Sequence, residues 1–152
     1  METGENGDSG DPDRVRAEIR ELAARSPFYA WAGMRVTRVD PGEVDVAMDV
    51  GGEHLNLRGL LHGGMIATLA DTASGLAIRS ALEPGRTHAT VQLDVQFLRP
   101  GGPGTIEAHG RAIRVGGSIA FAEADVLDAA GETIARATAT HAIGRSAPDP
   151  VQ

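Results

Sequence analysis

One long helix, expected to begin at Gly63 and to end before Pro84, constrains this chain more than any other segment. Side chains that are small or apolar recur through it with the spacing of one broad helical face. These are Ile66, Leu69, Ala70, Ala73, Leu76, Ala77 and Ala81. Because most of them are small, the element that covers this face can approach the helix backbone closely. A fold for this chain must therefore bury the helix against a second layer.

Alternating polar and apolar side chains, which are typical of β-strands, occur on both sides of the helix. The strand-like runs before it cover residues 33–39 and 43–50, and a turn at Asp40-Pro41-Gly42 joins them. The runs after it cover residues 87–98, 105–115, 118–127 and 132–143. Rows of alanine in the last two runs form a shallow groove for a helix: Ala120, Ala122, Ala124, Ala135, Ala137 and Ala139. We therefore expect an α+β fold, an antiparallel sheet of about six strands wrapped around one long central helix.

The first strand after the helix predicts the direction of one candidate residue. A regular strand sends alternate side chains to opposite faces. The apolar set in this strand is Val91, Leu93, Val95 and Phe97, and the polar set is Thr90, Gln92, Asp94 and Gln96. Thr90 is therefore expected to point away from the apolar row.

The N-terminal region is expected to contain a tail and a short helix. Residues 1–11 are poor in apolar side chains, which predicts a disordered tail. Asp11 and Pro12 suit the N-cap and the first position of an amphipathic helix that runs through about Ala24. Pro27 is expected to end that helix. The aromatic residues that follow are interpreted as a hydrophobic plug: Phe28, Tyr29 and Trp31.

Length and composition fit one domain with a closely packed core. Hydrophobic residues make up 41% of the 152 residues but aromatic residues only 3%, so small side chains must fill the core. We expect a single domain over residues 12–144, followed by a loose C-terminal tail over residues 145–152. Cysteine is absent, which excludes disulfides, thiolate metal sites and a cysteine nucleophile.

The charge of the chain excludes some classes of partner. A net charge of −7 argues against a nucleic-acid partner, which would need a basic patch. Single arginines, which supply all 14 cationic residues, can still hold an anionic ligand locally. No run approaches the ~18 apolar residues of a membrane span, and the acidic, glycine-rich N-terminus is unlike a signal peptide. The sequence thus predicts no nucleic-acid or membrane partner and a cytoplasmic location.

The start of the long helix is a candidate site. Gly63 and Gly64 let another group approach the first amides of the helix, which lack partners and carry a partial positive charge. Such amides can hold an oxygen that gains negative charge. Asp71 lies beside the apolar stripe, roughly 13 Å from His62 at ~1.5 Å per residue. The two ends can act on one substrate only if a second copy of the chain contributes; the plainer alternative is a tight turn and a solvated aspartate.

The spacing of these residues resembles a known family. The segment that contains Asn56, then Leu61-His62-Gly63-Gly64 and then Leu69-Ala70-Asp71 is similar to acyl-CoA thioesterases of the phenylacetic acid degradation type, over residues 28–143. The resemblance implies the hotdog fold and hydrolysis of an acyl-CoA thioester to free acid and CoA. It implies no metal and no cofactor, because coenzyme A is part of the substrate. It also implies a homodimer at minimum, and a homotetramer as the usual assembly.

The resemblance implies a role for each catalytic candidate. The Gly63 amide and the Asn56 side chain would polarise the thioester carbonyl, and His62 would position the thiolate leaving group. Asp71 of the partner subunit would act as a base on water or as a nucleophile, and Thr90 would steady the water. Each residue also has a purely structural alternative: a turn for Asn56, a helix cap for His62 and an ordinary strand position for Thr90.

Binding of the coenzyme A portion is predicted less directly. The substrate-binding candidates are Gly64, Arg99, Arg114, Gly117 and Ser118. Arginines suit phosphate groups, and glycine amides can also contact them. Many relatives have a cationic residue after the first glycine of the turn near residue 116, whereas this chain has Gly117 and Ser118 there.

Two other functions remain open at this point. The hotdog fold also occurs in hydratases of enoyl thioesters, but their pairing of histidine and aspartate on the central helix is not found here. A non-catalytic module that binds acyl-CoA is the alternative from a different class, although it has no need of Asp71 beside the apolar stripe. The remaining histidines, His88, His109 and His141, are interpreted as structural or exposed. The sequence does not distinguish aryl acyl groups from medium or long aliphatic ones.

Overall fold

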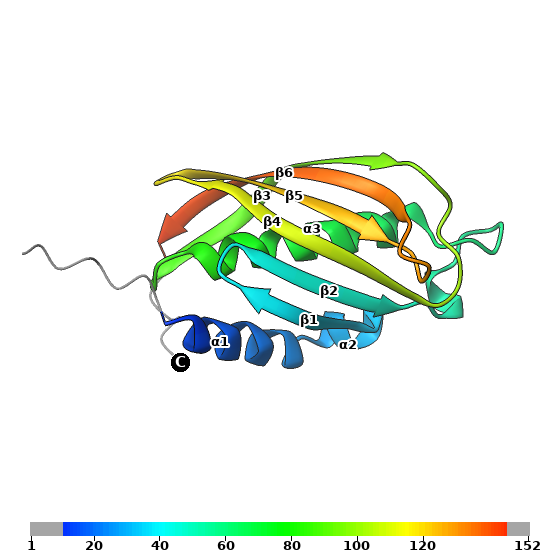
Figure 1. Cartoon of the computed structure of the whole chain (residues 1–152), viewed down its shortest axis with the longest axis horizontal. Helices are drawn as coiled ribbons and strands as arrows, with labels where there is room; N and C mark the ends of the chain where they lie inside the picture. Colours follow the sequence, from blue (N-terminus) through cyan, green and yellow to red (C-terminus); the bar gives the residue numbers. More distant parts are fainter. Residues whose placement is uncertain (1–10, 146–152) are drawn as a thin grey trace, which may run out of the picture.

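A computed structural model describes residues 11–145, which form one sheet and a set of helices packed on it (Figure 1). The elements in chain order are α1 (Pro12–Ala24), α2 (Pro27–Ala32), β1 (Met34–Asp40), β2 (Glu43–Asp49), the 3₁₀ turn η1 (Gly52–His54), α3 (Gly63–Ala81), β3 (Arg86–Phe97), β4 (Thr105–Val115), β5 (Ile119–Leu127) and β6 (Thr133–Arg145). The predicted tails, residues 1–11 and 145–152, lie outside the described residues except for Asp11 and Arg145. Arg145 itself belongs to β6 and pairs with Arg86, so the strand extends further than expected.

The six strands form a single antiparallel sheet in the order β1-β2-β4-β5-β6-β3. The sheet curves around α3, while α1 and α2 lie beside the β1 end (Figure 1). This confirms the expected α+β fold with one central helix. Both β1 and β3 are edge strands, so β3 has a strand partner on one side only within the described part of the chain.

Small residues set the distance between α3 and the sheet. The alanine rows of β5 and β6 are buried against the helix as expected. The backbones of α3 and the sheet also come very close at Gly110 of β4, a position not identified from the sequence. A methyl group on Gly110 would overlap the carbonyl group of Ala73 and lie 2.8 Å from the Ser74 nitrogen. The helix therefore packs directly on the β4 backbone at this point.

A bulge in β3 reverses the expected direction of Thr90. Thr90 pairs with His141, but Gln92 pairs with the adjacent residue Thr140, so Val91 is an extra residue in the strand. An extra residue shifts the alternation of side chains by one position. Val91 is consequently 62% exposed, and Thr90 faces α3. The prediction that Thr90 points away from the apolar row was wrong for this reason.

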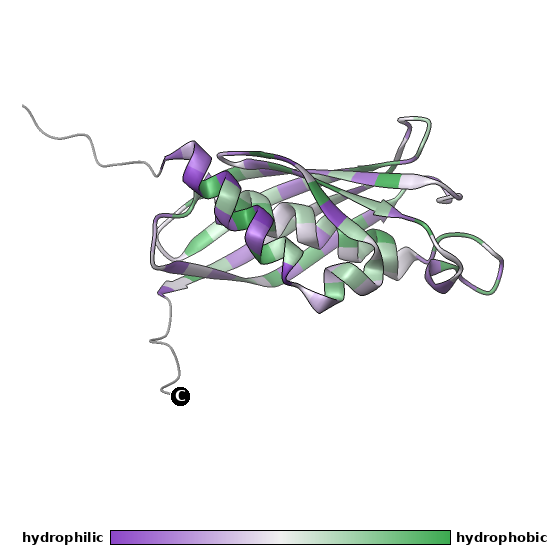
Figure 2. Cartoon of the chain, turned by 90° about the horizontal axis from the view of Figure 1, so that it is seen from below, coloured by the Kyte–Doolittle hydropathy of each residue, from purple (hydrophilic) through white to green (hydrophobic). Residues whose placement is uncertain are grey.

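The N-terminal helices differ from expectation in one respect. The Asp11 side chain accepts a hydrogen bond from the Asp13 amide and caps α1, as predicted. Helix α1 carries hydrophilic and hydrophobic residues (Figure 2). Its Ile19 side chain is buried in the core. Pro27 does not simply end this helix. It occupies the first turn of α2, whose N-cap is Ser26, because proline suits the first turn of a helix.

The aromatic residues of α2 do not form a buried plug. Phe28 and Trp31 are 47% and 58% exposed, and their rings stack with centroids 6.0 Å apart. Only Tyr29 packs against the core. The short helix directs its aromatic residues to different sides, which a run of aromatic letters does not reveal.

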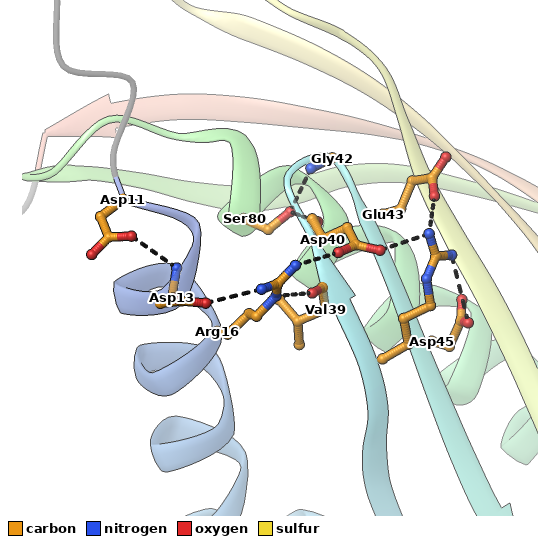
Figure 3. Close-up of polar contacts among 10 residues, drawn as sticks. Asp11, Asp13, Arg16, Val39, Asp40, Gly42, Glu43, Asp45 and Ser80 are labelled. Carbon is orange, nitrogen blue, oxygen red and sulfur yellow. Dashed lines mark hydrogen bonds and ion pairs between the residues drawn. The ribbon is translucent and has the colours of Figure 1, made fainter.

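A polar network fastens the β1–β2 turn to the C-terminal part of α3 and to α1 (Figure 3). The buried Ser80 hydroxyl accepts a hydrogen bond from the Gly42 amide at 2.8 Å. Arg16 donates to the Val39 carbonyl oxygen at 2.9 Å and to Asp40 Oδ1 at 2.8 Å. These contacts hold the hairpin on the helix far from the Gly63 end. Within the described residues, no helix has the length and apolar character needed to cross a membrane.

Candidate active site

The N-terminus of α3 is capped by a histidine. His62 Nδ1 accepts a hydrogen bond from the Gly64 amide at 2.8 Å. An accepting Nδ1 carries no proton, so this contact assigns the neutral tautomer with the proton on Nε2. The helix cap considered for His62 is therefore real. It still leaves an exposed Nε2–H donor beside the helix start.

The amide of Gly63 is free to bind a ligand. No acceptor among residues 11–145 takes its hydrogen, as expected for the first residue of a helix. The Phe97 ring lies against Gly63, and an added Cβ would come 3.3 Å from its Cε1 atom. An added Cβ on Gly64 would lie 2.9 Å from His62 Nδ1. Both glycines thus leave room for a neighbouring ring, and the Gly64 amide is already occupied.

Asn56 combines a turn with a free donor group. Its side-chain oxygen accepts hydrogen bonds from the amides of Arg58 at 2.8 Å and Leu60 at 3.2 Å. These two donors assign the oxygen and nitrogen of the Asn56 amide group. The Nδ2 group has no acceptor in the described part of the chain. The turn therefore orients Asn56 and leaves its two N–H groups available.

Asn56 and Gly63 open onto the same pocket. The pocket has a volume of about 270 Å³ and is lined mainly by apolar side chains. Its walls include Leu60, Leu61, Ile66, Phe97, Leu98 and Pro100. Arg99 also lines it, and its guanidinium group pairs with the exposed Glu132 at 2.7 Å. A polarised carbonyl and an apolar substituent can therefore be held side by side at the start of α3.

A second polar group lies further along α3. The Thr90 hydroxyl donates a hydrogen bond to Asp71 Oδ1 at 2.8 Å, which joins β3 to the helix. Thr90 also lies 3.5 Å from Nδ1 of His141, which in turn lies 3.3 Å from Nδ1 of His88. His141 is completely buried. The sequence analysis did not predict this direct contact between Asp71 and Thr90, nor the two histidines behind it.

One sequence signal could have found His141. It continues the alternate positions of Ala135, Ala137 and Ala139, the row that faces α3. Because alternate residues of a strand point to the same face, the His141 imidazole lies on the side of the sheet that faces α3. His88 gave no such signal, since the bulge at Val91 changes the faces of all β3 residues before it.

Burial favours the neutral form of both histidines. Loss of solvent is the main cause that lowers the pKa of His141, and the charge of Asp71 opposes it. Burial also lowers the pKa of His88, with a further lowering by His141 and Arg79 and an opposing effect of Asp71. A positive charge beside Asp71 is therefore disfavoured near neutral pH.

Within one chain, the donors at Gly63 and Asn56 are separate from the Asp71–Thr90 pair. Gly63 and Asp71 are about 12 Å apart along the helix at ~1.5 Å per residue.

Among the candidates for binding coenzyme A, Arg99 and Gly64 lie at the Gly63 end of α3. The remaining candidates, Arg114, Gly117 and Ser118, lie at the β4–β5 turn, next to a row of paired residues that links Thr90 through β6 and β5 to Val115. Three strand spacings of ~4.8 Å place Val115 roughly 14 Å from Thr90.

Two further polar clusters of the described residues lie on the outer face of the sheet. Asp45, Glu107 and His109 bring potential metal-ligand atoms within 4.8 Å of one another. A hollow of about 420 Å³ is lined in part by Arg111 and Arg136, which pair with Glu123 and Asp125. Neither cluster includes a residue of the α3 site.

Known proteins share this sequence and fold. Residues 58–135 match the Thioesterase superfamily. The human acyl-coenzyme A thioesterase 13 is 34% identical over 136 residues, which are 86% of this chain and 94% of that protein. A thioesterase family protein from Silicibacter pomeroyi has 28% identity and a TM-score of 0.82 over 87% of this chain and 99% of its own. The E. coli PaaI protein from the phenylacetic acid degradation operon shares the fold, with a TM-score of 0.80 at 23% identity over 90% and 96% of the two chains.

These similarities include the start of α3 at Gly63 and the Asp71–Thr90 pair. The match over residues 58–135 contains Gly63, Asp71 and Thr90. The fold agrees with the solved thioesterase structures over nearly the whole described chain. The chain therefore belongs to the thioesterase superfamily, has the hotdog fold, and is a thioester hydrolase.

Proposed function

We propose that this protein is an acyl-CoA thioesterase whose active site forms between two copies of the chain. One observation carries the proposal: Gly63, which lines one pocket with the Asn56 side chain, is about 12 Å from Asp71 along α3 at ~1.5 Å per residue. Within residues 11–145, the Gly63 amide and Asn56 Nδ2 have no acceptor, and the side chain of Asp71 is hydrogen-bonded only to Thr90. The edge of β3 that has no strand partner within the described residues runs beside both groups and offers a surface for a second copy.

The layout of β3 predicts how two copies meet. The strand runs antiparallel to α3, because Phe97 lies against Gly63 while Thr90 contacts Asp71. A two-fold axis between Leu93 and Asp94 would pair the β3 strands and place Thr90 opposite the partner's Phe97. That arrangement brings Asp71 of one subunit toward the Gly63 amide of the other. It also covers apolar side chains at the edge, including Val91 and Phe97, which are more than half exposed in the single chain.

Hydrolysis then follows from the chemistry of these groups. The Gly63 amide and Asn56 Nδ2 bind the thioester oxygen and stabilise the negative charge that develops on it. Asp71 accepts a proton from a water molecule whose oxygen attacks the carbonyl carbon. The C–S bond breaks, and the Nε2–H of His62 donates a hydrogen bond to the departing thiolate. Thr90 holds one oxygen of Asp71 and thereby directs the other toward the water.

The substrate class follows from the two sides of the site. The apolar pocket beside Gly63 suits an acyl group or the pantetheine arm, and Arg99 at its wall suits a phosphate group. Arg114, Gly117 and Ser118 lie near the Thr90 side, where they would face the nucleotide of the same substrate. Gly64 contributes through its missing side chain, since its amide is bound to His62. A dimer is the minimum assembly, and a dimer of dimers is the expected larger one.

Release of free thiol from a panel of aryl- and fatty acyl-CoAs tests the proposal. The wild type and Asp71→Asn are compared, with Asp125→Asn on the outer face as a matched carboxylate control. A folded, dimeric Asp71→Asn that loses about 10²-fold in kcat supports the mechanism, while Asp125→Asn retains activity. Full activity of Asp71→Asn would contradict the mechanism. Binding of acyl-CoA without turnover by the wild type would favour a non-catalytic module.

A further inference from the structure

A pair of histidines lies behind the Asp71–Thr90 contact, and the mechanism above does not use it. His141 Nδ1 is 3.5 Å from the Thr90 hydroxyl and 3.3 Å from His88 Nδ1. The Nε2 atom of His141 is buried and has no hydrogen-bond partner in the described part of the chain. A completely buried polar ring with one partnered and one unpartnered nitrogen requires an explanation.

The direction of the Thr90 hydrogen bond determines the role of His141. Thr90 uses its single hydroxyl proton to donate to Asp71 Oδ1. Its oxygen can then only accept from His141, so His141 Nδ1 must carry a proton. The opposite tautomer would bury an unpaired N–H at Nε2 and would turn Nδ1 into an acceptor that competes for the Thr90 proton. The neutral ring with its proton on Nδ1 satisfies both conditions.

We propose that His141 is a positioning residue that donates from Nδ1 to the Thr90 oxygen and thereby keeps the Thr90 proton on Asp71. The chain of contacts runs from His141 through Thr90 to Asp71 Oδ1. It leaves Asp71 Oδ2, which has no partner among the described residues, to accept the proton from water. His88 Nδ1 is the second acceptor for the His141 proton and limits rotation of the ring. This inference rests on the proposed function for its catalytic consequence.

The helix is shaped to accommodate the two rings. Gly75 lies one turn beyond Asp71 on α3, where glycine lowers helix stability relative to alanine. An added Cβ at Gly75 would come 3.3 Å from His88 Cε1 and 3.7 Å from His141 Cε1. The missing side chain thus leaves space for both imidazoles under the helix. Burial, which lowers the pKa of both rings, is consistent with a neutral donor at this place.

A double-mutant cycle on thiol release tests the coupling. His141→Leu removes the donor, and His141→Asn keeps an N–H near the Nδ1 position. We expect His141→Leu to lower kcat about tenfold and to leave KM within about twofold, and His141→Asn to retain most of the activity. In a Thr90→Val background, His141→Leu should have no further effect, because the hydroxyl that it orients is gone. His109→Asn, on the outer face, serves as the histidine control with unchanged activity.

The proposal would be overturned if the fold-losses in kcat of His141→Leu and Thr90→Val multiplied in the double variant. It would also be overturned if His141→Leu alone had wild-type activity. A measurement on the wild-type protein covers the case in which His141→Leu does not fold. ¹⁵N NMR of the imidazoles near neutral pH should show His141 neutral and protonated on Nδ1. An Nε2–H tautomer or a charged ring would refute the assignment. Absence of turnover in the wild type refutes the proposed function instead, and the NMR result stays decisive for the tautomer.

Discussion

The Thr90 hydroxyl donates a 2.8 Å hydrogen bond to Asp71 Oδ1, and this contact joins the edge strand β3 to the central helix α3. It exists because the bulge at Val91 turns Thr90 toward the helix. A backbone irregularity therefore orients the carboxylate that we propose as the base. The contact also lies beside the strand edge where a second copy is expected to pair.

Removal of the Thr90 hydroxyl should lower turnover without loss of the fold. Thr90→Val keeps the side-chain shape but leaves Asp71 without its donor, and we expect kcat to fall by about 10-fold to 100-fold. Thr90→Ser retains the hydroxyl and should stay within a few-fold of the wild type. Steady-state thiol release measures both variants. Equal losses in the two would show that the methyl group, and not the hydroxyl, matters.

Two substitutions of His62 should distinguish its role as a helix cap from its proposed role in catalysis. His62→Ala loses the side-chain acceptor for the Gly64 amide, which should lower the free energy of unfolding by about 1 kcal/mol. Asparagine is a good N-cap, so His62→Asn should keep that stability while it removes the Nε2–H donor near the leaving group. Urea unfolding and thiol release on the same preparations distinguish the two roles. A His62→Asn variant with wild-type kcat would leave His62 as a cap only.

Position 63 should accept an alanine only if the Phe97 ring moves or is replaced by a smaller side chain. Gly63→Ala places Cβ at 3.3 Å from the Phe97 ring. We expect this crowding to displace the helix start from the carbonyl position and to lower kcat/KM by about tenfold, since small shifts of an oxyanion donor are costly. The double variant with Phe97→Leu should recover part of the loss. If the double variant has the same kcat/KM as Gly63→Ala alone, contact with the Phe97 ring is not the cause of the loss.

Ser80 provides a test of stability far from the site. Ser80→Ala leaves the Gly42 amide without its buried acceptor and removes the donor to the Ala77 carbonyl oxygen. We expect the free energy of unfolding to fall by about 1–3 kcal/mol. Activity at a temperature well below the melting point should be unchanged, because Ser80 lies at the opposite end of α3. Thermal unfolding and thiol release check the two halves of this prediction.

The histidine pair should make the fold sensitive to mild acid. Because the pKa of His88 and of His141 is lowered in the folded protein, the unfolded chain binds protons first as the pH falls below about 6.5. Stability should therefore be unaffected by these groups above that pH and should decrease as the pH drops below it. Melting temperatures measured between about pH 7.5 and pH 5 test this. The His141→Asn variant should show a shallower decrease, and an equal slope would remove His141 as a cause.

Local signals in the sequence were sufficient for most of the elements. The helix period and glycines located α3, and the Asp11 cap with Pro12 located α1. The turn at Asp40-Pro41-Gly42 located the first hairpin. These features depend on neighbours within a few residues, so periodicity, caps and turns report them directly. The exposed aromatic residues of α2 lack such a signal, because their environment depends on how α2 sits on the core.

The chemical groups of the site and the elements that carry them could be predicted from the sequence: a glycine amide at a helix start, a carboxylate further along that helix, and a threonine on the next strand. Which of these groups meet depends on the tertiary structure. The pairing of β3 with β6, with one extra residue at Val91, brings Thr90 and His141 together under Asp71. The helix length keeps Gly63 away from Asp71 in the same chain. Strand register and packing arise from contacts between distant residues, and short-range patterns do not encode them.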